Sequence, residues 1–269
     1  MALTQLIVHA VVQAVTEVFP IGGAGHQALI SQFLDNPPPD KALSLTLRAA
    51  LLLAVLTYFW RDLLDMAGGV MRAAKGKRDP GARLALQIFV AAIPTLGLGF
   101  AFEQYIAGPW ETPAVMGWAI VGFGVLMLLF DRMSMTVKRI EHASYADAIA
   151  ISICQVLALI PGAGTAAVTM TMARVLGYER AHAVRLAFLL TIPVSAAVIA
   201  RDAYTLFEID GETVANPEIM AGAAGFVAAL IAIAILMSWL RRSTFMPFLV
   251  YRLLLGAAVL TLAYDLIAV

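Results

Sequence analysis

Residues 13–26 read QAVTEVFPIGGAGH, and this proline- and glycine-rich break in an apolar segment decides the fold. The segment that it interrupts covers residues 1–34. A second apolar segment, residues 145–184, is interrupted in the same way by PGAG at 161–164. Proline removes a backbone donor and glycine has unusual conformational freedom, so a helix is expected to end at each break. Each segment is therefore predicted to form two short helices joined by a tight loop.

The composition places these breaks in a membrane protein. Of the 269 residues, 61% are hydrophobic and only 13% are charged, and the mean hydropathy is +0.86. Soluble domains contain roughly 45–50% apolar and about 25% charged residues. The formal net charge is zero, which argues against a nucleic-acid partner. The single cysteine, Cys154, excludes an internal disulfide framework.

Six apolar runs are long enough to cross a bilayer as helices, and the loops between them alternate in charge. The runs cover approximately residues 43–60, 85–101, 114–130, 186–200, 219–240 and 248–268. Arginine and lysine gather in 61–84, 132–139 and 241–242, whereas 35–40, 103–111 and 202–218 are acidic or neutral. The positive-inside rule assigns the basic loops to the cytoplasm.

This loop assignment predicts how the two broken segments enter the membrane. Segment 145–184 lies between two basic regions, so we expect it to enter the bilayer and return on the same side. Segment 1–34 must end on the opposite side, where a matching re-entrant hairpin is the simplest arrangement. The alternative is that both segments are plain spans with a kink.

Each half of the chain then has one re-entrant hairpin and three spans. Because three is odd, the second half (about 140–269) is inverted relative to the first (about 1–135). We therefore predict an all-α, polytopic protein with a single membrane domain, residues 1–269, built as an inverted repeat of six transmembrane helices and two hairpins. In such folds the broken helices meet near the midplane, with Pro20 and Pro161 as equivalent break points.

The first loop has residues that fit anion chemistry. Gln13 and Glu17 are four residues apart and share one helix face, and an ionisable residue at membrane depth indicates function. His26 follows in the first turn of the next helix, where it would act as acid, base or hydrogen-bond donor. The alternative is that Glu17 hydrogen-bonds the loop and His26 caps the helix. Backbone N–H groups at the start of that helix would bind phosphate, supplied by Gly22, Gly23 and Gly25.

The second loop likewise has backbone N–H groups without neighbouring side chains at Gly162 and Gly164, and it adds hydroxyl groups at Thr165 and Thr169. These four residues are predicted to bind phosphate, although hydroxyls in membrane helices commonly bond their own backbone.

Two arginines lie within otherwise apolar spans. Arg48 would pair with Glu17 or with a bound phosphate, or would extend to the head groups. Arg252 is expected to be an interfacial anchor.

These motifs resemble those of the undecaprenyl-diphosphatase family, the bacitracin-resistance membrane proteins that recycle the lipid carrier of cell-wall synthesis. The family also has inverted repeats with two re-entrant hairpins. The resemblance extends through the whole chain and includes LAVLTYFWRD (53–62), LALIPG (157–162), TMTMARVLG (169–177), FLLTIP (188–193) and FMPFLVYR (245–252).

Several catalytic positions implied by the resemblance are changed in this chain, while Glu17, His26 and Thr169 are kept. The changed positions are Gln13 for a glutamate, Gly22, Gly23 and Ala24 for Ser-Ser-Thr, Gly164, Thr165 and Ala166 for Ser-Arg-Ser, and Arg48 for a histidine. The motif arginine and serine are thus absent. Loss of one electrostatic contact to a developing charge often costs about 10²–10³ in rate.

Two functions stay open at this point. In the first, the protein is a phosphatase in which Glu17, alone or as a ligand of Mg²⁺ or Ca²⁺, activates water while Arg48 and His26 stabilise the phosphoryl group. In the second, it is a non-enzymatic relative that binds or transports a polyprenyl phosphate lipid. In both, the partner is a polyprenyl phosphate or diphosphate in a bacterial inner membrane. The oligomeric state is open, a homodimer included.

Overall fold

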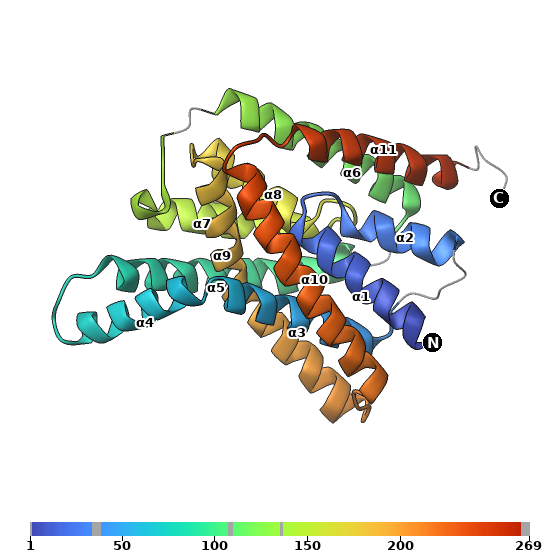
Figure 1. Ribbon diagram of the computed structural model, residues 1–269, viewed down its shortest axis with the longest axis horizontal. Helices are drawn as coiled ribbons and strands as arrows, with labels where there is room; N and C mark the ends of the chain where they lie inside the picture. The colour runs from blue at the N-terminus through green and yellow to red at the C-terminus, as the bar shows by residue number, and fades with distance from the viewer. Residues whose placement is uncertain (1, 34–38, 107–109, 135–136, 265–269) are drawn as a thin grey trace.

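The computed structural model describes residues 2–33, 39–106, 110–134 and 137–264 (Figure 1). Its regular elements are helical, and the one isolated backbone bridge in the described residues joins Lys138 to Tyr178. The elements in chain order are α1 (Leu3–Val18), α2 (Gly23–Phe33), α3 (Lys41–Tyr58), α4 (Trp60–Ala74), α5 (Pro80–Ile106), α6 (Pro113–Met133), η1 (Ile140–His142), α7 (Tyr145–Cys154), η2 (Gln155–Leu159), α8 (Thr165–Val175), α9 (Arg180–Tyr204), η3 (Thr205–Ile209), α10 (Asn216–Leu240) and α11 (Met246–Ala263).

Six helical segments in the described part of the chain are long and apolar enough to cross a membrane, which confirms the six predicted spans. They are Lys41–Tyr58, Pro80–Glu103, Pro113–Met133, Arg180–Ile209, Asn216–Leu240 and Met246–Ala263. The predicted end of the last span, 265–268, lies outside the described residues. Large apolar side chains such as Phe89, Ile93 and Leu254 are exposed on these helices, as lipid-facing residues are. The protein is therefore a polytopic membrane protein.

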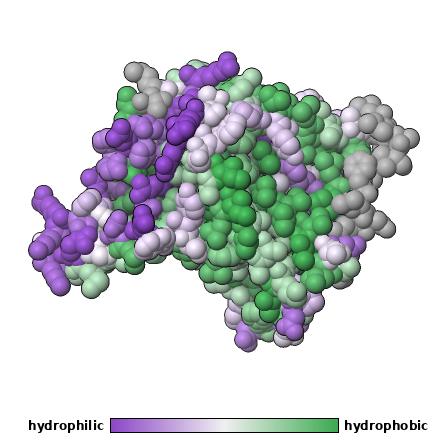
Figure 2. Space-filling view, in the orientation of Figure 1, coloured by the Kyte–Doolittle hydropathy of each residue, from purple (hydrophilic) through white to green (hydrophobic). Residues whose placement is uncertain are grey.

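Hydrophilic side chains gather in Figure 2 where α4 and its following loop project from the bundle (Figure 1), and they continue up that side of the molecule. This loop is closed by Arg72, whose Nε donates to Asp79 Oδ2 at 2.6 Å. That hydrogen bond holds the pKa of the Asp79 carboxyl below its ordinary value. The middle of the same face, over α10 and α1, is hydrophobic.

The two broken segments form pairs of short helices, as their prolines and glycines predict. The first pair is α1 and α2, and the second consists of α7, η2 and α8. Positive φ angles at Gly22 (+89°) and Gly162 (+94°) turn the chain between the members of each pair, a conformation that glycine adopts without a Cβ clash. That these pairs enter a membrane from opposite sides stays a prediction.

The helix contacts occur in corresponding pairs between the two halves. Helix α1 packs on α10 as α7 packs on α5, and α3 packs on α10 as α9 packs on α5. Helix α8 packs on α6 as α2 packs on α11, while α3 packs on α9 and α6 on α11 (Figure 1). If each helix is exchanged for its counterpart in the other half, the first three pairs of contacts are converted into one another. The α3–α9 and α6–α11 contacts join counterparts, so they stay the same. An internal repeat would produce this pattern, although its inversion across a membrane stays a prediction.

The two loops meet in the interior of the bundle. A Cβ at Gly22 would lie 3.6 Å from the carbonyl oxygen of Gly162, and both glycines pack against the side chain of Ile120 on α6. Helix α6 therefore supports both breaks from one side.

Arg252 on α11 holds this meeting point together, and its predicted role as an interfacial anchor is wrong. The residue is fully buried. Its guanidinium donates to the carbonyl oxygens of Ile120 (2.8 Å) and Gly162 (2.8 Å), with longer bonds to those of Ala163, Pro20 and Ala119. A guanidinium group is planar and has five N–H donors, so it can donate to several carbonyl oxygens at once. One cation thus joins both loops to α6.

We expect Arg252→Met to destabilise the protein by about 3 kcal/mol or more, because buried carbonyls of both loops lose a charged donor. Thermal unfolding of the purified protein in detergent measures this, with the exposed Arg242→Met as the matched control. Arg252→Lys should fall between the two, since an ammonium has fewer donors. A wild-type unfolding temperature for Arg252→Met would show that the guanidinium is dispensable.

Candidate active site

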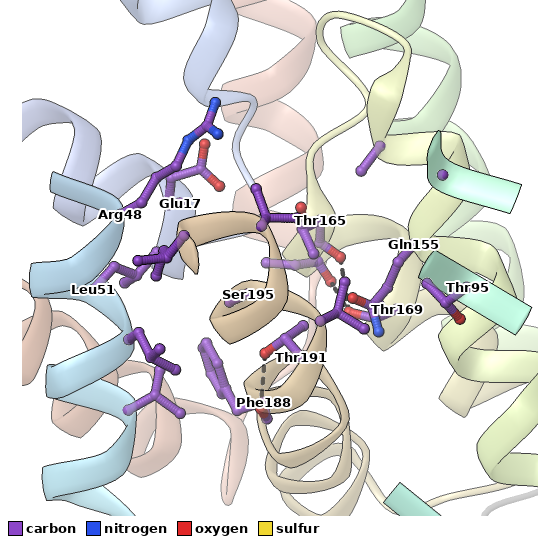
Figure 3. Close-up of a pocket in the computed structure, with 18 of the residues that line it drawn as sticks. Glu17, Arg48, Leu51, Thr95, Gln155, Thr165, Thr169, Phe188, Thr191 and Ser195 are labelled. Carbon is purple, nitrogen blue, oxygen red and sulfur yellow. Dashed lines mark hydrogen bonds between the residues drawn. The ribbon is translucent and has the colours of Figure 1, made fainter. Parts of the chain in front are cut away.

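A cavity of about 350 Å³ lies between α1, α3, α5, α9 and the second broken segment (Figure 3). Five residues singled out from the sequence line it: Gln13, Glu17, Arg48, Thr165 and Thr169. Its remaining walls are largely apolar, including side chains such as Leu51, Val55 and Phe188. A cavity with apolar walls and a few polar groups suits a ligand that has both an apolar and a charged part.

Glu17 lies at the C-terminal end of α1, one helical turn after Gln13, and both face the cavity. Its carboxylate also lies beside the first residue of α2, because a Cβ at Gly23 would be 3.3 Å from Glu17 Oε1. Negative charge is favoured at a helix N-terminus. The first glycine loop therefore has the protein's own carboxylate beside it.

Arg48 comes from α3 and lies next to Glu17, both reaching into the cavity (Figure 3). Its ion-pair partner is Asp202 on α9 and not Glu17, which is one of the three alternatives predicted for Arg48. Asp202 also accepts from Arg201 at 3.1 Å, and Arg201 Nη2 donates to Glu103 Oε1 at 3.1 Å. These charges connect α3, α5 and α9.

The charged group lies at the open end of the cavity. The side chains of Arg48, Glu103 and Arg201 are 48%, 45% and 40% exposed, whereas Thr169 is fully buried. The cavity thus has a charged, accessible end and an enclosed wall.

Thr165 begins α8, and with Ala166 it presents the N-terminus of that helix to the cavity. Unpaired N–H groups at such a terminus favour an anion. The hydroxyl of Thr169 donates to the carbonyl oxygen of Thr165 at 2.7 Å, so its proton is already engaged by the backbone. The second loop thus contributes chiefly a helix terminus.

His26 is not among the residues that line this cavity. Its Nδ1 is 2.9 Å from the Gly22 carbonyl oxygen and its Nε2 is 2.7 Å from the hydroxyl of Tyr251. The two rings stack nearly parallel, with centroids 5.5 Å apart. The structure therefore separates His26 from Glu17's cavity and links it to α11 next to Arg252. Its predicted catalytic role stays a prediction.

The predicted phosphate-binding glycines also lie outside the lining of the cavity: Gly22, Gly23, Gly25, Gly162 and Gly164. Most of them stand where the backbone comes close to a neighbouring group. A Cβ at Gly25 would be 2.5 Å from Ile120 Cδ1, and one at Gly162 would be 2.5 Å from the Met116 carbonyl oxygen. All of these glycines except Gly164 therefore allow close packing of the backbone, and their predicted phosphate binding stays a prediction.

Sequence reasoning missed six polar residues of the lining: Thr95, Glu103, Gln155, Thr191, Ser195 and Arg201. They come from α5, η2 and α9. Their one signal in the sequence is a polar residue within or at the end of an apolar run, as with Thr191 and Ser195, four residues apart on α9. That signal does not reveal which helix face lines a cavity, and helix packing decides it.

The donor set for a metal ion is small. Among the described residues, no three His, Cys, Asp or Glu side chains lie close enough together to hold an ion. Mg²⁺ is often bound through one or two carboxylates, with substrate phosphates and waters completing its octahedron. The carboxylate of Glu17 fits an ion that arrives with a diphosphate, and does not fit an ion held by protein ligands alone.

Known proteins resemble this chain over nearly its whole length. The model of the family described as bacitracin resistance protein BacA matches residues 6–258. The chain is 42% identical to undecaprenyl-diphosphatase 1 of Rhodospirillum rubrum, over 98% of this chain and 96% of the relative. It is 36% identical to undecaprenyl-diphosphatase of Roseobacter denitrificans, over 98% of this chain and all of the relative.

The glycines of the second loop should respond differently to alanine. Both have positive φ, which costs a side chain about 1–3 kcal/mol. Gly164 has open space for a Cβ, whereas Gly162 would clash with the Met116 carbonyl oxygen. We expect Gly162→Ala to lower the unfolding temperature in detergent clearly more than Gly164→Ala does. Equal effects would mean that the close approach to α6 is not maintained.

Proposed function

The chain belongs to the bacitracin resistance protein BacA family, and from this premise we propose that it is a membrane phosphatase acting on a polyprenyl diphosphate. The product would be the polyprenyl monophosphate carrier used in bacterial cell-wall synthesis, released together with inorganic phosphate in the cytoplasmic membrane. The observation that carries this proposal is the position of Glu17 and Arg48, which lie side by side in one cavity with apolar walls (Figure 3).

The chemistry requires an activated water and stabilisation of the charge that develops on the phosphoryl group. Glu17 would accept a proton from water as the water oxygen attacks the terminal phosphorus. The bond from that phosphorus to the bridging oxygen then breaks, and the monophosphate lipid leaves with the bridging oxygen. Where the substrate brings Mg²⁺ or Ca²⁺, the ion would neutralise phosphate charge, with Glu17 as its ligand from the protein.

The positive charge of the missing motif arginine has a substitute in this cavity. The position of that arginine is Thr165, which lines the cavity without a charge. Arg48 and Arg201 line the same cavity from α3 and α9. A phosphate entering at the open end would meet both guanidiniums, which can bind its oxygens in bidentate fashion.

The aliphatic walls suit the isoprenoid part of the substrate. The cavity is lined by Leu47, Leu51 and Leu52 from α3 and by Val194 and Val198 from α9. Burial of apolar surface contributes roughly 25 cal/mol per Å², so these walls favour a lipid over a water-soluble diphosphate. The expected substrate is therefore a diphosphate with a long hydrocarbon chain.

Phosphate release from undecaprenyl diphosphate, measured with detergent-purified protein in the presence and absence of Mg²⁺ or Ca²⁺, tests the proposal. We expect Glu17→Gln to lower kcat by at least about 10²-fold, because the amide cannot accept the proton. The exposed Glu141→Gln, outside the cavity, is the matched control. Wild-type protein that releases no phosphate under any of these conditions would contradict the phosphatase, and would favour binding or transport of the lipid.

The substitute cation has its own test in the same assay. We expect Arg48→Gln to lower kcat/KM by about 10²-fold, in line with the loss of one contact to a developing charge. Introducing the family arginine through Thr165→Arg should restore part of the activity in the Arg48→Gln protein. The exposed Arg61→Gln is the control. Unchanged kcat/KM in Arg48→Gln would remove Arg48 from the site.

A further inference from the structure

The enclosed wall of the cavity contains a side-chain amide nitrogen that has no hydrogen-bond partner. Gln155 lines the cavity with its side chain and is only 8% exposed. Its Nε2 is fully buried and has no hydrogen-bond partner in the structure. A buried donor left unpaired is costly, and native proteins rarely keep one without a reason.

The position of Gln155 follows from the break at Pro161. Helix α7 ends at Cys154, and the chain tightens into the 3₁₀ turn η2, which begins at Gln155. This change of helix type in the middle of an apolar segment often marks a functional position. Figure 3 places Gln155 beside Thr169, on the far side of the cavity from Glu17 and Arg48.

The hydroxyls nearest to Gln155 have no free proton to offer an anion, because each already donates to a carbonyl of its own helix. Thr169 Oγ1 donates to the Thr165 carbonyl oxygen at 2.7 Å and Thr95 Oγ1 to that of Ala91 at 3.0 Å. The enclosed wall therefore offers one unused donor, close to the N-terminus of α8. Both features attract an anion.

We propose that Gln155 is a phosphate-binding residue of the substrate site, and that its amide donates to a phosphate oxygen of the bound lipid. This inference rests on the proposed function and adds a donor that belongs to neither Pro-Gly loop. The phosphate would be held between the amide and the N-terminus of α8 on one side and the charged open end on the other. The unpaired donor is then the cost of a preformed site, offset when the phosphate binds.

A matched glutamine allows a sharp test. Gln87 on α5 is equally buried, but its Nε2 donates to the Ala143 carbonyl oxygen at 2.8 Å and it lies outside the cavity. Replacing Gln87 by leucine removes a satisfied hydrogen bond, whereas replacing Gln155 by leucine removes an unsatisfied group. Only the substitution of Gln87 should therefore lower the stability of the protein.

We expect Gln155→Leu to keep or raise the unfolding temperature in detergent, and to raise the KM for undecaprenyl diphosphate about tenfold or more, the usual effect of losing a hydrogen bond to a charged group. Gln87→Leu should lower the unfolding temperature and leave KM unchanged. Gln155→Glu, which puts a carboxylate in place of the donor, should weaken binding more than Gln155→Leu does.

Binding without turnover separates this inference from the phosphatase itself. The Kd of farnesyl diphosphate is measured for wild-type and Gln155→Leu protein, with inorganic phosphate as competitor. Weaker binding of both ligands in Gln155→Leu supports a contact to phosphate, even if the wild-type protein hydrolyses nothing. Active wild-type protein whose KM and Kd values are unchanged in Gln155→Leu would overturn the inference and leave the phosphatase intact.

Discussion

The buried guanidinium of Arg252 is the interaction on which the rest of the structure depends. Two breaks in apolar segments leave backbone carbonyls in an interior where water cannot satisfy them, and each unpaired group would be costly there. Arg252 donates to the carbonyl oxygens of Pro20 in the first break and Gly162 in the second. The breaks can be packed inside the bundle because one charged side chain from the last long helix donates to carbonyls of both. Their carbonyls in turn take the place of a carboxylate partner.

The joined loops determine where the cavity lies. Once Gly22 and Gly162 pack against Ile120, helix α1 ends with Glu17 beside the start of α2, and α8 begins with Thr165 facing the same space. Helices α3 and α9 close the sides with aliphatic residues. The ion pair of Arg48 with Asp202 then connects these two helices at the open end. The carboxylate, the helix terminus and the two cations come from four different helices, so their proximity depends on the packed loops.

The substitutions in the family motifs also have a physical explanation in this packing. The motif arginine and serine are replaced by Thr165 and Gly164, and the positive charge of the cavity is provided by arginines on α3 and α9 instead. The cavity therefore keeps positive charge on other helices, although Thr165 itself has none. Backbone positions have less freedom, because Gly162 has no room for a side chain against α6.

The sequence by itself determined the class of the protein, its six spans, the positions of the two breaks and the family, because hydropathy, loop charge and proline-glycine punctuation act locally along the chain. It also identified Glu17, Arg48 and Thr165, since charges and motif positions stand out in apolar segments. Only the tertiary structure decided that Arg252 is buried, that His26 pairs with Tyr251 outside the cavity, and that Gln155 and Arg201 face into it. Those facts depend on which helix faces meet across more than a hundred residues of chain, as with His26 and Tyr251. A local sequence pattern does not determine which face of a helix turns towards a distant helix. The packing of the two loops on Arg252 determines it.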